Sequence, residues 1–395
     1  MLSIDEARAE ILAAVPQPVT EEVSLAEAHG RILAEEVAAA HDVPPFANSA
    51  MDGFAVRGSG ATFDVIGESR AGSPFDGRLG EGEAVRISTG AALPEGADAV
   101  VPVERSALRH GTTANAEQLI ADGPVAPGDH VRYAGEDLRA GAVVLAAGTR
   151  LSPAALGVAA GAGRAALRVA RRPRVAIVAT GDELVAPGAP LGPGQIHDSN
   201  ALALGALVSE AGAVVAASLR ARDDREGTVT ALHEALEASD LVLVSGGVSV
   251  GPHDHVKPAL AELGVQERFW RVALRPGKPT WFGTQGATLV IGLPGNPVSA
   301  LVTFVLFARP ALAALQGAQP APRRRVRLAH PISRRAERDE AVRVRLDADG
   351  RARATTERQG SHVLSSMLGA DGLAIVARGE GEMAAGDLVE FEPLS

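Results

Sequence analysis

The stretch LVIGLPGNPVSALVTFVLF, Leu289 to Phe307, contains no charged residue, so it is either a membrane span or part of a buried core. Its length would suit a bilayer, which takes about 20 apolar residues. The Pro-Gly-Asn-Pro run at 294–297 argues against a span, because a continuous helix needs backbone donors and helix formers there. We therefore predict a short buried strand over 289–293, a turn, and a buried helix from Pro297 with Asn296 as its N-cap.

The start of this predicted helix is a candidate anion site, since the peptide amides of Val298 and Ser299 would point out of its N-terminus. A sharp strand-to-helix corner inside a core explains the same residues equally well. The segment alone leaves both interpretations open.

The chain has 395 residues, too many for one core, so we expect roughly two to four domains. With 46% hydrophobic and 22% charged residues it has the composition of a globular protein. The start, MLSIDEARAEIL, lacks the basic and apolar regions of a signal peptide, and the absence of cysteine excludes disulfides and thiolate metal sites. We expect a cytoplasmic protein that does not enter a membrane.

The net charge of −10 argues against broad nucleic-acid binding. The charge is uneven, because the segment 323–358 holds 12 Arg against 6 Asp and Glu. Most of these arginines are read as an ordinary domain surface, and a few as facing an anionic substrate. Only Lys257 and Lys278 are lysines, so the lysine in RPGKP (275–279) reflects either a need for a compact point charge or chance.

The outer parts of the chain show mixed patterns. Helical spacing predicts helices over 3–15 and 20–40, and residues 139–168 are Ala-rich and also read as helical. Between 54 and 144 short apolar runs broken by Gly, Pro and Asp predict a mostly β insertion. In the tail, AVRVRLDADGRARATTE predicts a hairpin around Asp349-Gly350, within a small all-β domain.

The central third alternates strands with helices, which predicts a parallel sheet covered by helices on both faces. The predicted strands lie at 174–180, 213–221, 240–245 and 289–293, and the predicted helices at 199–211, 224–238 and 254–263. Three strands end in small turns, at Thr180-Gly181, Ser245-Gly246-Gly247 and Leu293-Pro294-Gly295. Because ligands lie beyond the carboxyl ends of such strands, we expect a site at this edge of the sheet.

Carboxylates recur in the turns, at Asp52, Asp137, Glu183, Asp198, Asp223 and Asp254. Without cysteines, oxygen ligation of a hard cation such as Mg²⁺ is the natural expectation. Each carboxylate is alternatively a cap or turn former, above all Asp198 and Asp223. His253 and His255 form an HxH pair that could bind zinc, although no third ligand is obvious. No dinucleotide loop, P-loop or catalytic triad is present.

Several motifs, taken in order, point to one family: NSAMDGFAV, ISTGAALPEGADAVV, GEDLRAG, TGDEL, GQIHDSN, SGGVSVGPHDHVK, RPGKP and GLPGNPVSA. Together they resemble the bacterial MoeA family of molybdopterin molybdenumtransferases, which is similar to the E domain of gephyrin. The resemblance covers essentially the whole chain.

The resemblance implies an elongated homodimer with a multidomain α/β plus β fold. The implied parts are a helix at 1–20 joining the α/β domain, an extended connecting domain at 21–45 and 139–168, a β insertion domain at 46–138, a molybdopterin-binding α/β domain at 169–318 with a parallel sheet, and a C-terminal β-barrel-like domain at 319–395. It also implies a reaction, in which adenylylated molybdopterin and molybdate react with the help of Mg²⁺ or Zn²⁺, AMP leaves, and molybdenum enters the dithiolene.

The resemblance implies three sets of site residues. Those for the metal, the phosphates or hydrolysis are Asp52, Thr89, Asp137, Glu183, Asp223 and Asp254, of which Asp52, Glu183 and Asp254 hold the metal. Those for molybdate are Arg275, Lys278, Ser299, Arg338, Arg343, Ser361 and Ser366. Those for molybdopterin or its phosphate are Thr180, Gly181, Asp182, Ser245, Gly246, Gly247, Ser249, Gly251, Pro294, Gly295, Asn296 and Pro297.

The resemblance also implies that the active site is shared between subunits, with Asp52 and Asp137 reaching it from the partner. Two departures stand out. The family reads KPGKP where this chain has RPGKP, and a GRxxFxR pattern here keeps Arg338 and Arg343 but loses its glycine and aromatic positions. Both put the geometry of the molybdate ligands in question.

Three other functions remain to be separated from this one. A molybdopterin adenylyltransferase shares the α/β domain and is the expected upstream partner, but it would not need residues 21–168 or the β tail. A scaffold would leave the catalytic carboxylates unused. A paralogue acting on tungstate would select another oxyanion.

Overall fold

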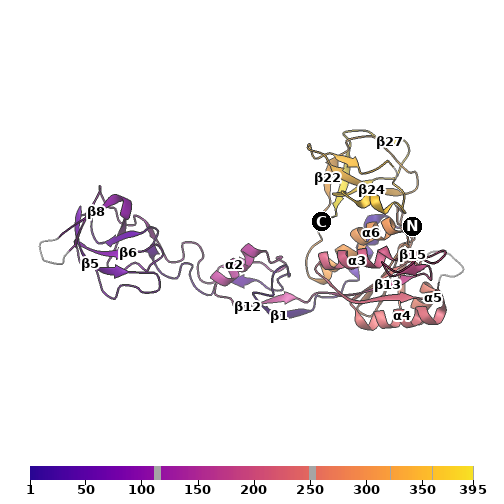
Figure 1. Cartoon of the computed structure of the whole chain (residues 1–395), viewed down its shortest axis with the longest axis horizontal. Coiled ribbons are helices and arrows are strands. Elements are labelled where there is room, and N and C mark those ends of the chain that lie inside the picture. The colour runs from indigo at the N-terminus through magenta and orange to yellow at the C-terminus, as the bar shows by residue number, and fades with distance from the viewer. Residues whose placement is uncertain (111–116, 249–254, 321, 358, 395) are drawn as a thin grey trace. The chain divides into compact units, whose positions relative to one another are not determined.

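A computed structural model describes residues 1–110, 117–248, 255–320, 322–357 and 359–394 of the chain (Figure 1). The described chain divides into two compact units. The first unit comprises Met1–Glu21, Gly30–Ala34 and Arg168–Ser395, and the second comprises Glu22–His29 and Glu35–Leu167. The domain boundaries expected from the sequence are finer than these units and stay a prediction.

A six-stranded sheet forms the centre of the first unit, in the order β16-β13-β17-β21-β20-β18. Its strands are β13 (Arg174–Thr180), β16 (Val214–Ala221), β17 (Leu241–Ser245), β18 (Gln266–Trp270), β20 (Trp281–Gln285) and β21 (Thr288–Leu293). The four strands predicted for the parallel sheet, β13, β16, β17 and β21, do run parallel. β20 runs antiparallel to both of its neighbours, because the tight turn at Gln285–Thr288 feeds it directly into β21.

Helices cover both faces of this sheet, as the alternating pattern predicts. Helices α1 (Ile4–Ala13), α3 (Ser199–Glu210) and α6 (Pro297–Thr303) share a buried core on one face, and α4 (Arg225–Ala238) and α5 (Val256–Glu262) share another core on the opposite face (Figure 1). A capping box between Ser3 and Glu6 starts α1, which buries Ile4, Ala7 and Ile11. A small parallel pair, β14 (Leu184–Val185) and β15 (Ile196–His197), precedes α3.

The helix that begins at Pro297 continues beyond α6 through a π-helical stretch η2 (Phe304–Ala308) into α7 (Arg309–Leu315). Among the described residues Pro297–Leu315 is the one helix long and apolar enough to cross a membrane, but 78% of its apolar window is buried inside the fold. The strand, turn and helix predicted for Leu289–Phe307 are therefore confirmed, as parts of a core.

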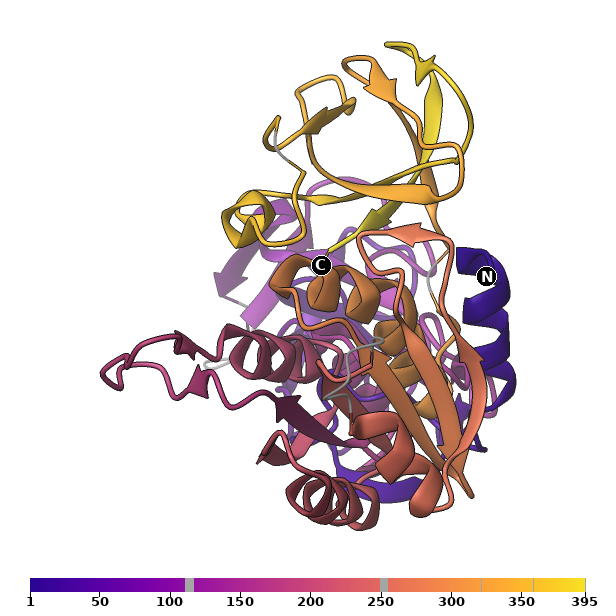
Figure 2. The ribbon, with the colours of Figure 1, turned by 90° about the vertical axis from the view of Figure 1, so that its right-hand side faces the viewer.

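The C-terminal residues form a β domain within the first unit (Figure 2). Its main sheet runs β19-β24-β26-β28-β22, with β25 beside β24. The elements are β19 (Leu274–Arg275), β22 (Arg324–Arg327), β23 (Ile332–Ser333), β24 (Asp339–Leu346), β25 (Ala352–Ala354), η3 (Leu364–Met367), β26 (Gly372–Val376), β27 (Glu382–Met383) and β28 (Leu388–Pro393). The predicted hairpin is confirmed, since Leu346 pairs with Ala352 across the Asp349-Gly350 turn.

The second unit is mostly β, as predicted for 54–144. Its main sheet runs β7-β4-β6-β5-β9-β8. The elements are β2 (Val37–Ala38), β3 (Asn48–Ser49), β4 (Gly53–Val56), β5 (Thr62–Ser69), β6 (Glu83–Ile87), β7 (Ala99–Pro102), η1 (Val103–Arg105), β8 (Ser106–His110), β9 (Glu117–Ala121), β10 (Val131–Arg132), β11 (Val143–Leu145) and α2 (Pro153–Gly161). Strands β1 (Thr20–Ser24) and β12 (Ala166–Ala170) pair with each other.

Two helix predictions are wrong. Residues 20–40 form strands and turns, because their amides bond to distant carbonyls, as Ala34 does to Arg168, and because Gly30 adopts a φ of +73°. Within 139–168 only α2 is helical, since β11 pairs with β2. Helical spacing in both segments was overridden by pairing between parts of the chain that lie far apart in sequence.

Candidate functional site

The ends of the strands meet along one edge of the first unit's sheet. Ser245 pairs with Leu293, and Thr180 pairs with Ala221, so the turns after four parallel strands open on this edge. The sequence predicted three of these turns together. The structure confirms that they are neighbours and adds the end of β18, because β18 is antiparallel to β20 and therefore parallel to β21.

Two glycine-containing turns approach each other closely at this edge. Gly246 has a φ of +94°, and a Cβ built there would lie 2.6 Å from Thr180 Oγ1. A Cβ on Gly295 would lie 3.6 Å from the Gly246 Cα, so the turns after β17 and β21 are in contact. Asn200 ties them together, because its Nδ2 donates to Ser245 Oγ at 2.9 Å and to the Gly295 carbonyl at 2.8 Å.

The carboxylates after β13 and β16 are exposed and mutually ordered. The Asp182 amide donates to Asp223 Oδ2 at 3.2 Å, and the Asp223 amide donates to Asp182 Oδ1 at 3.4 Å. A Cβ on Gly181 would lie 2.4 Å from Glu183 Oε2, which shows that the Glu183 side chain folds back over the turn. Asp182, Glu183 and Asp223 thus form one acidic end of the edge.

The RPGKP segment joins this edge to the C-terminal β domain. β19 pairs with β24 in parallel, which aligns Arg275 with Glu340. Arg275 Nη1 lies 3.6 Å from Glu340 Oε1, and Arg335 lies 3.6 Å from the other carboxylate oxygen. Lys278 has no carboxylate partner among the described residues, so its ammonium group is available to an anion.

Arg343 is the buried cation of the C-terminal domain. It is fully buried, with Nε donating to Ser366 Oγ at 3.1 Å and Nη2 donating to the Gly360 carbonyl at 3.3 Å. Burial lowers the pKa of Arg343 to about 10, an effect that Glu340 opposes and Arg275 reinforces. Its Nη1 is buried and has no hydrogen-bond partner in the described chain.

The other predicted molybdate ligands are placed differently. The Ser366 hydroxyl donates to the Val363 carbonyl and accepts from Arg343, so both of its main bonds are taken. Arg338 is half-buried and makes no side-chain hydrogen bond or ion pair with described residues. Ser299 is buried in the first turn of α6.

The anion site expected at the start of α6 is only partly available. The Val298 amide donates to the Ser361 carbonyl at 3.1 Å, so this amide already has a protein acceptor. Asn296 occupies the N-cap position, as predicted, but its side chain makes no capping hydrogen bond. The C-terminal domain therefore provides a carbonyl acceptor for one of the two amides that the sequence predicted to bind an anion.

Three predicted residues lie in the second unit. Asp52 Oδ1 accepts from the Thr89 amide at 2.7 Å and from Thr89 Oγ1 at 2.9 Å. These two bonds hold the pKa of the Asp52 carboxyl below its usual value. Asp137 is exposed, and its amide bonds to the Val43 carbonyl.

Ser249, Gly251, His253 and Asp254 lie outside the described residues. Among the residues that are described, no group of three or more His, Asp or Glu side chains is arranged to hold a metal ion. The expectation that Asp52, Glu183 and Asp254 share a metal therefore stays a prediction.

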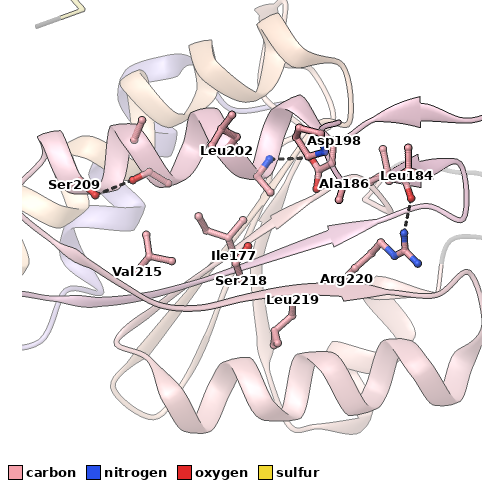
Figure 3. Close-up of a pocket in the computed structure, with 15 residues that line it drawn as sticks. Ile177, Leu184, Ala186, Asp198, Leu202, Ser209, Val215, Ser218, Leu219 and Arg220 are labelled. Carbon is pink, nitrogen blue, oxygen red and sulfur yellow. Dashed lines mark hydrogen bonds between the residues drawn. The ribbon is translucent and has the colours of Figure 1, made fainter. Parts of the chain in front are cut away.

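A cavity lies on the α3 face of the first unit, apart from these residues (Figure 3). It has a volume of about 730 Å³ and is bounded by α3, β16 and the β14 strand. Leu202 and Val215 line it, and Arg220 closes one end with a hydrogen bond to the Leu184 carbonyl. Its walls are mostly apolar and include none of the residues predicted to bind substrate.

Sequence reasoning missed Asn200 and Glu340. Asn200 lies in the GQIHDSN motif, which gave a signal, but only the fold shows that it bridges two turns. Glu340 gave no signal, because its importance comes from pairing with Arg275 across two strands.

Comparison with known proteins agrees with this architecture. Residues 2–163 match the MoeA N-terminal region (domain I and II), residues 176–314 a probable molybdopterin binding domain, and residues 325–394 the MoeA C-terminal region (domain IV). A molybdopterin molybdenumtransferase of Haemophilus influenzae is 37% identical, covering 100% of this chain and 99% of its own. Molybdopterin molybdenumtransferase 2 of Mycobacterium tuberculosis is 41% identical over 76% of each chain.

A solved structure extends the match to three dimensions. The molybdopterin biosynthesis MoeA protein from Pyrococcus horikosii is 31% identical, superposes with a TM-score of 0.85, and covers 100% of this chain and 99% of that one. The full-length matches in sequence and structure leave no part of the chain unaccounted for. The chain therefore belongs to the MoeA family of molybdopterin molybdenumtransferases.

Proposed function

We propose that this protein inserts molybdenum from molybdate into adenylylated molybdopterin, with release of AMP, as an enzyme of molybdenum cofactor biosynthesis. The carrying observation is that the RPGKP cations lie in the loop between Trp270 and Trp281, which joins the end of β18 to β20 at the same sheet edge as the glycine turns. Phosphates suit the turns, and an oxyanion suits the cations. The names of the relatives agree with this chemistry.

Molybdate would lie between Arg275, Lys278 and Arg343. Lys278 offers a point charge without a described partner, and Arg343 offers the one guanidinium nitrogen that its own domain leaves unbonded. Arg275 would have to share its guanidinium group between Glu340 and the molybdate. Ser361 and Ser366 would then hold the shape of the pocket, since their hydrogen bonds fix α6 and Arg343.

The phosphates would lie over the Ser245–Gly247 and Pro294–Pro297 turns, where Asn200 holds the two loops together. We also propose that carboxylates of the chain hold a Mg²⁺ ion, or Zn²⁺ in its place. Mg²⁺ usually takes one or two carboxylates and completes its shell with waters and substrate phosphates, so a cluster of three side chains is not required. Glu183 and Asp52 would hold it together with Asp254, and the bound cation would polarise the phosphoanhydride.

A homodimer with a shared active site completes the proposal. Asp52, Thr89 and Asp137 would reach the sheet edge from the partner subunit. Support comes from the apolar cavity of Figure 3, where Leu202 is 70% exposed. Exposed apolar surface of this kind is typical of protein–protein contacts. We further propose a cytoplasmic reaction, fed by a molybdopterin adenylyltransferase, without nucleic acid or membrane partners.

The test is a single-turnover assay with adenylylated molybdopterin, Mg²⁺ and molybdate, following AMP and the metal-bound cofactor. Molybdate-dependent release of AMP together with cofactor formation is the expected result. Formation of the adenylylated intermediate from molybdopterin and ATP would support an adenylyltransferase instead. Binding without either reaction would indicate a scaffold, and turnover only with tungstate would indicate a paralogue for that oxyanion.

A further inference from the structure

Trp270, the last residue of β18, carries two cations. Lys257 Nζ lies 3.5 Å and the Arg271 guanidinium carbon lies 3.9 Å from the centroid of the indole ring. Both distances are within the range of a cation–π interaction. The two charges are therefore no more than 7.4 Å apart, the sum of these distances.

This cluster, Lys257–Trp270–Arg271, lies at the sheet edge described above. The register aligns Trp270 with Trp281, Trp281 with Gly292, and Gly292 with Val244, which directly precedes Ser245. The Trp270 Nε1 donates to the Val248 carbonyl at 3.1 Å, and Val248 follows the Gly246-Gly247 turn. The ring is thereby fixed beside the turn that we propose to hold a phosphate.

The cluster has an excess of positive charge. Neither Lys257 nor Arg271 forms an ion pair with a described carboxylate, so two like charges share one ring and repel each other. Arg271 also has a φ of +77°, which is uncommon for a residue with a side chain, while its amide is held by the Thr280 carbonyl at 2.9 Å. Lys257 and Lys278 are the only lysines of the chain, and Lys278 lies in the loop that joins β18 to β20.

We propose that Lys257 and Arg271, held on Trp270, form a binding subsite for a phosphate group of the substrate. This inference rests on the proposed function, since it extends the phosphate site at the glycine turn toward β18. The phosphate is either that of the adenylate or that on the pterin side of the diphosphate. The indole orients the two cations, and a bound phosphate relieves their repulsion.

The test uses the intrinsic fluorescence of Trp270 and isothermal titration calorimetry with two probes, AMP and inorganic pyrophosphate. The variants are Lys257→Met and Arg271→Met, which keep an apolar stem over the ring. Arg268→Ala is the matched control, since Arg268 is exposed on the same strand and has no ring contact. Trp270→Phe is the fluorescence blank, because the other tryptophan, Trp281, is buried.

We expect each Met variant to weaken binding by about tenfold or more, as loss of one charge-assisted contact does, while Arg268→Ala binds normally. Dependence of AMP binding on the two cations assigns the subsite to the adenylate phosphate. Dependence of pyrophosphate binding alone assigns it to the pterin side. If both Met variants bind both probes as the wild type does, the proposed subsite does not exist, whether or not the protein inserts molybdenum. If wild-type protein fails to insert molybdenum but pyrophosphate binding still needs both cations, only the proposed function falls.

Discussion

Arg275 Nη1 lies 3.6 Å from Glu340 Oε1, so the arginine of RPGKP is paired with a buried carboxylate of the C-terminal domain. The same carboxylate also pairs with Arg335. Glu340 therefore sets how much positive charge Arg275 offers to an incoming oxyanion.

Glu340→Gln should lower the KM for molybdate, because Arg275 then keeps its full charge for the anion. The expected change is up to about fivefold, since a partly exposed ion pair contributes up to ~1 kcal/mol. Steady-state kinetics with varied molybdate measures it. Glu337→Gln is the control, as Glu337 is exposed and unpaired among described residues. An unchanged or raised KM in Glu340→Gln alone would show that Glu340 does not restrain Arg275.

Lys278→Ala should lose molybdenum insertion while keeping its fold, since it removes a cation that has no described structural partner. Loss of a hydrogen bond to a charged group predicts a fall of kcat/KM by roughly 10- to 100-fold. The single-turnover assay gives the rate, and circular dichroism checks the fold. Normal insertion by this variant would remove Lys278 from the molybdate site.

Arg343→Gln should destabilise the first unit by roughly 2–4 kcal/mol, because it strips bonds from Ser366 and from the Gly360 carbonyl in a fully buried setting. Urea unfolding can be followed by fluorescence, as both tryptophans lie in this unit. Arg338→Gln, which removes a half-buried arginine without a described partner, should change stability by less than about 0.5 kcal/mol. Equal losses in the two variants would show that the hydrogen bonds of Arg343 to Ser366 and Gly360 do not stabilise the unit.

Asp52 should titrate below the ordinary aspartate pKa of ~3.9, because Thr89 donates two hydrogen bonds to its ionised form. Since the folded pKa is lowered, the resulting stabilisation is present above about pH 4 and is lost as the pH falls through the folded pKa. Carbon-detected NMR titration measures it. Thr89→Ala should raise the pKa only part of the way, because the backbone bond, the larger cause, remains. A pKa that does not move would show that the Thr89 hydroxyl bond is absent in solution.

Leu202→Glu should weaken the proposed dimer by about 100-fold or more, the scale of an interface hot spot. Leu202 is 70% exposed beside the cavity of Figure 3, and a charge there could not be buried without a partner. Sedimentation velocity over a range of concentrations measures the association. Leu108→Glu, at an exposed leucine on β8, should leave the dimer intact. A Leu202→Glu protein that dimerises as tightly as the wild type would place the interface elsewhere.

Much of the fold could be predicted because its signals are local. The apolar run and the Pro-Gly-Asn-Pro break fixed a strand, a turn and a helix over Leu289–Phe307. The alternation in the central third predicted the order of elements and the shared edge of the strand ends. At residues 20–40, in contrast, helical spacing was misleading, since hydrogen bonds to distant strands outweigh a weak local preference.

The sequence by itself determined which residue types face the strand ends, because strand, turn and helix signals each act over a few residues. Only the tertiary structure decided how those residues are used. It paired Arg275 with Glu340, buried Arg343 against Ser366, and gave the Val298 amide to the Ser361 carbonyl. These contacts join segments that are far apart in the chain, and their energies depend on burial and distance, which no local pattern of residues encodes.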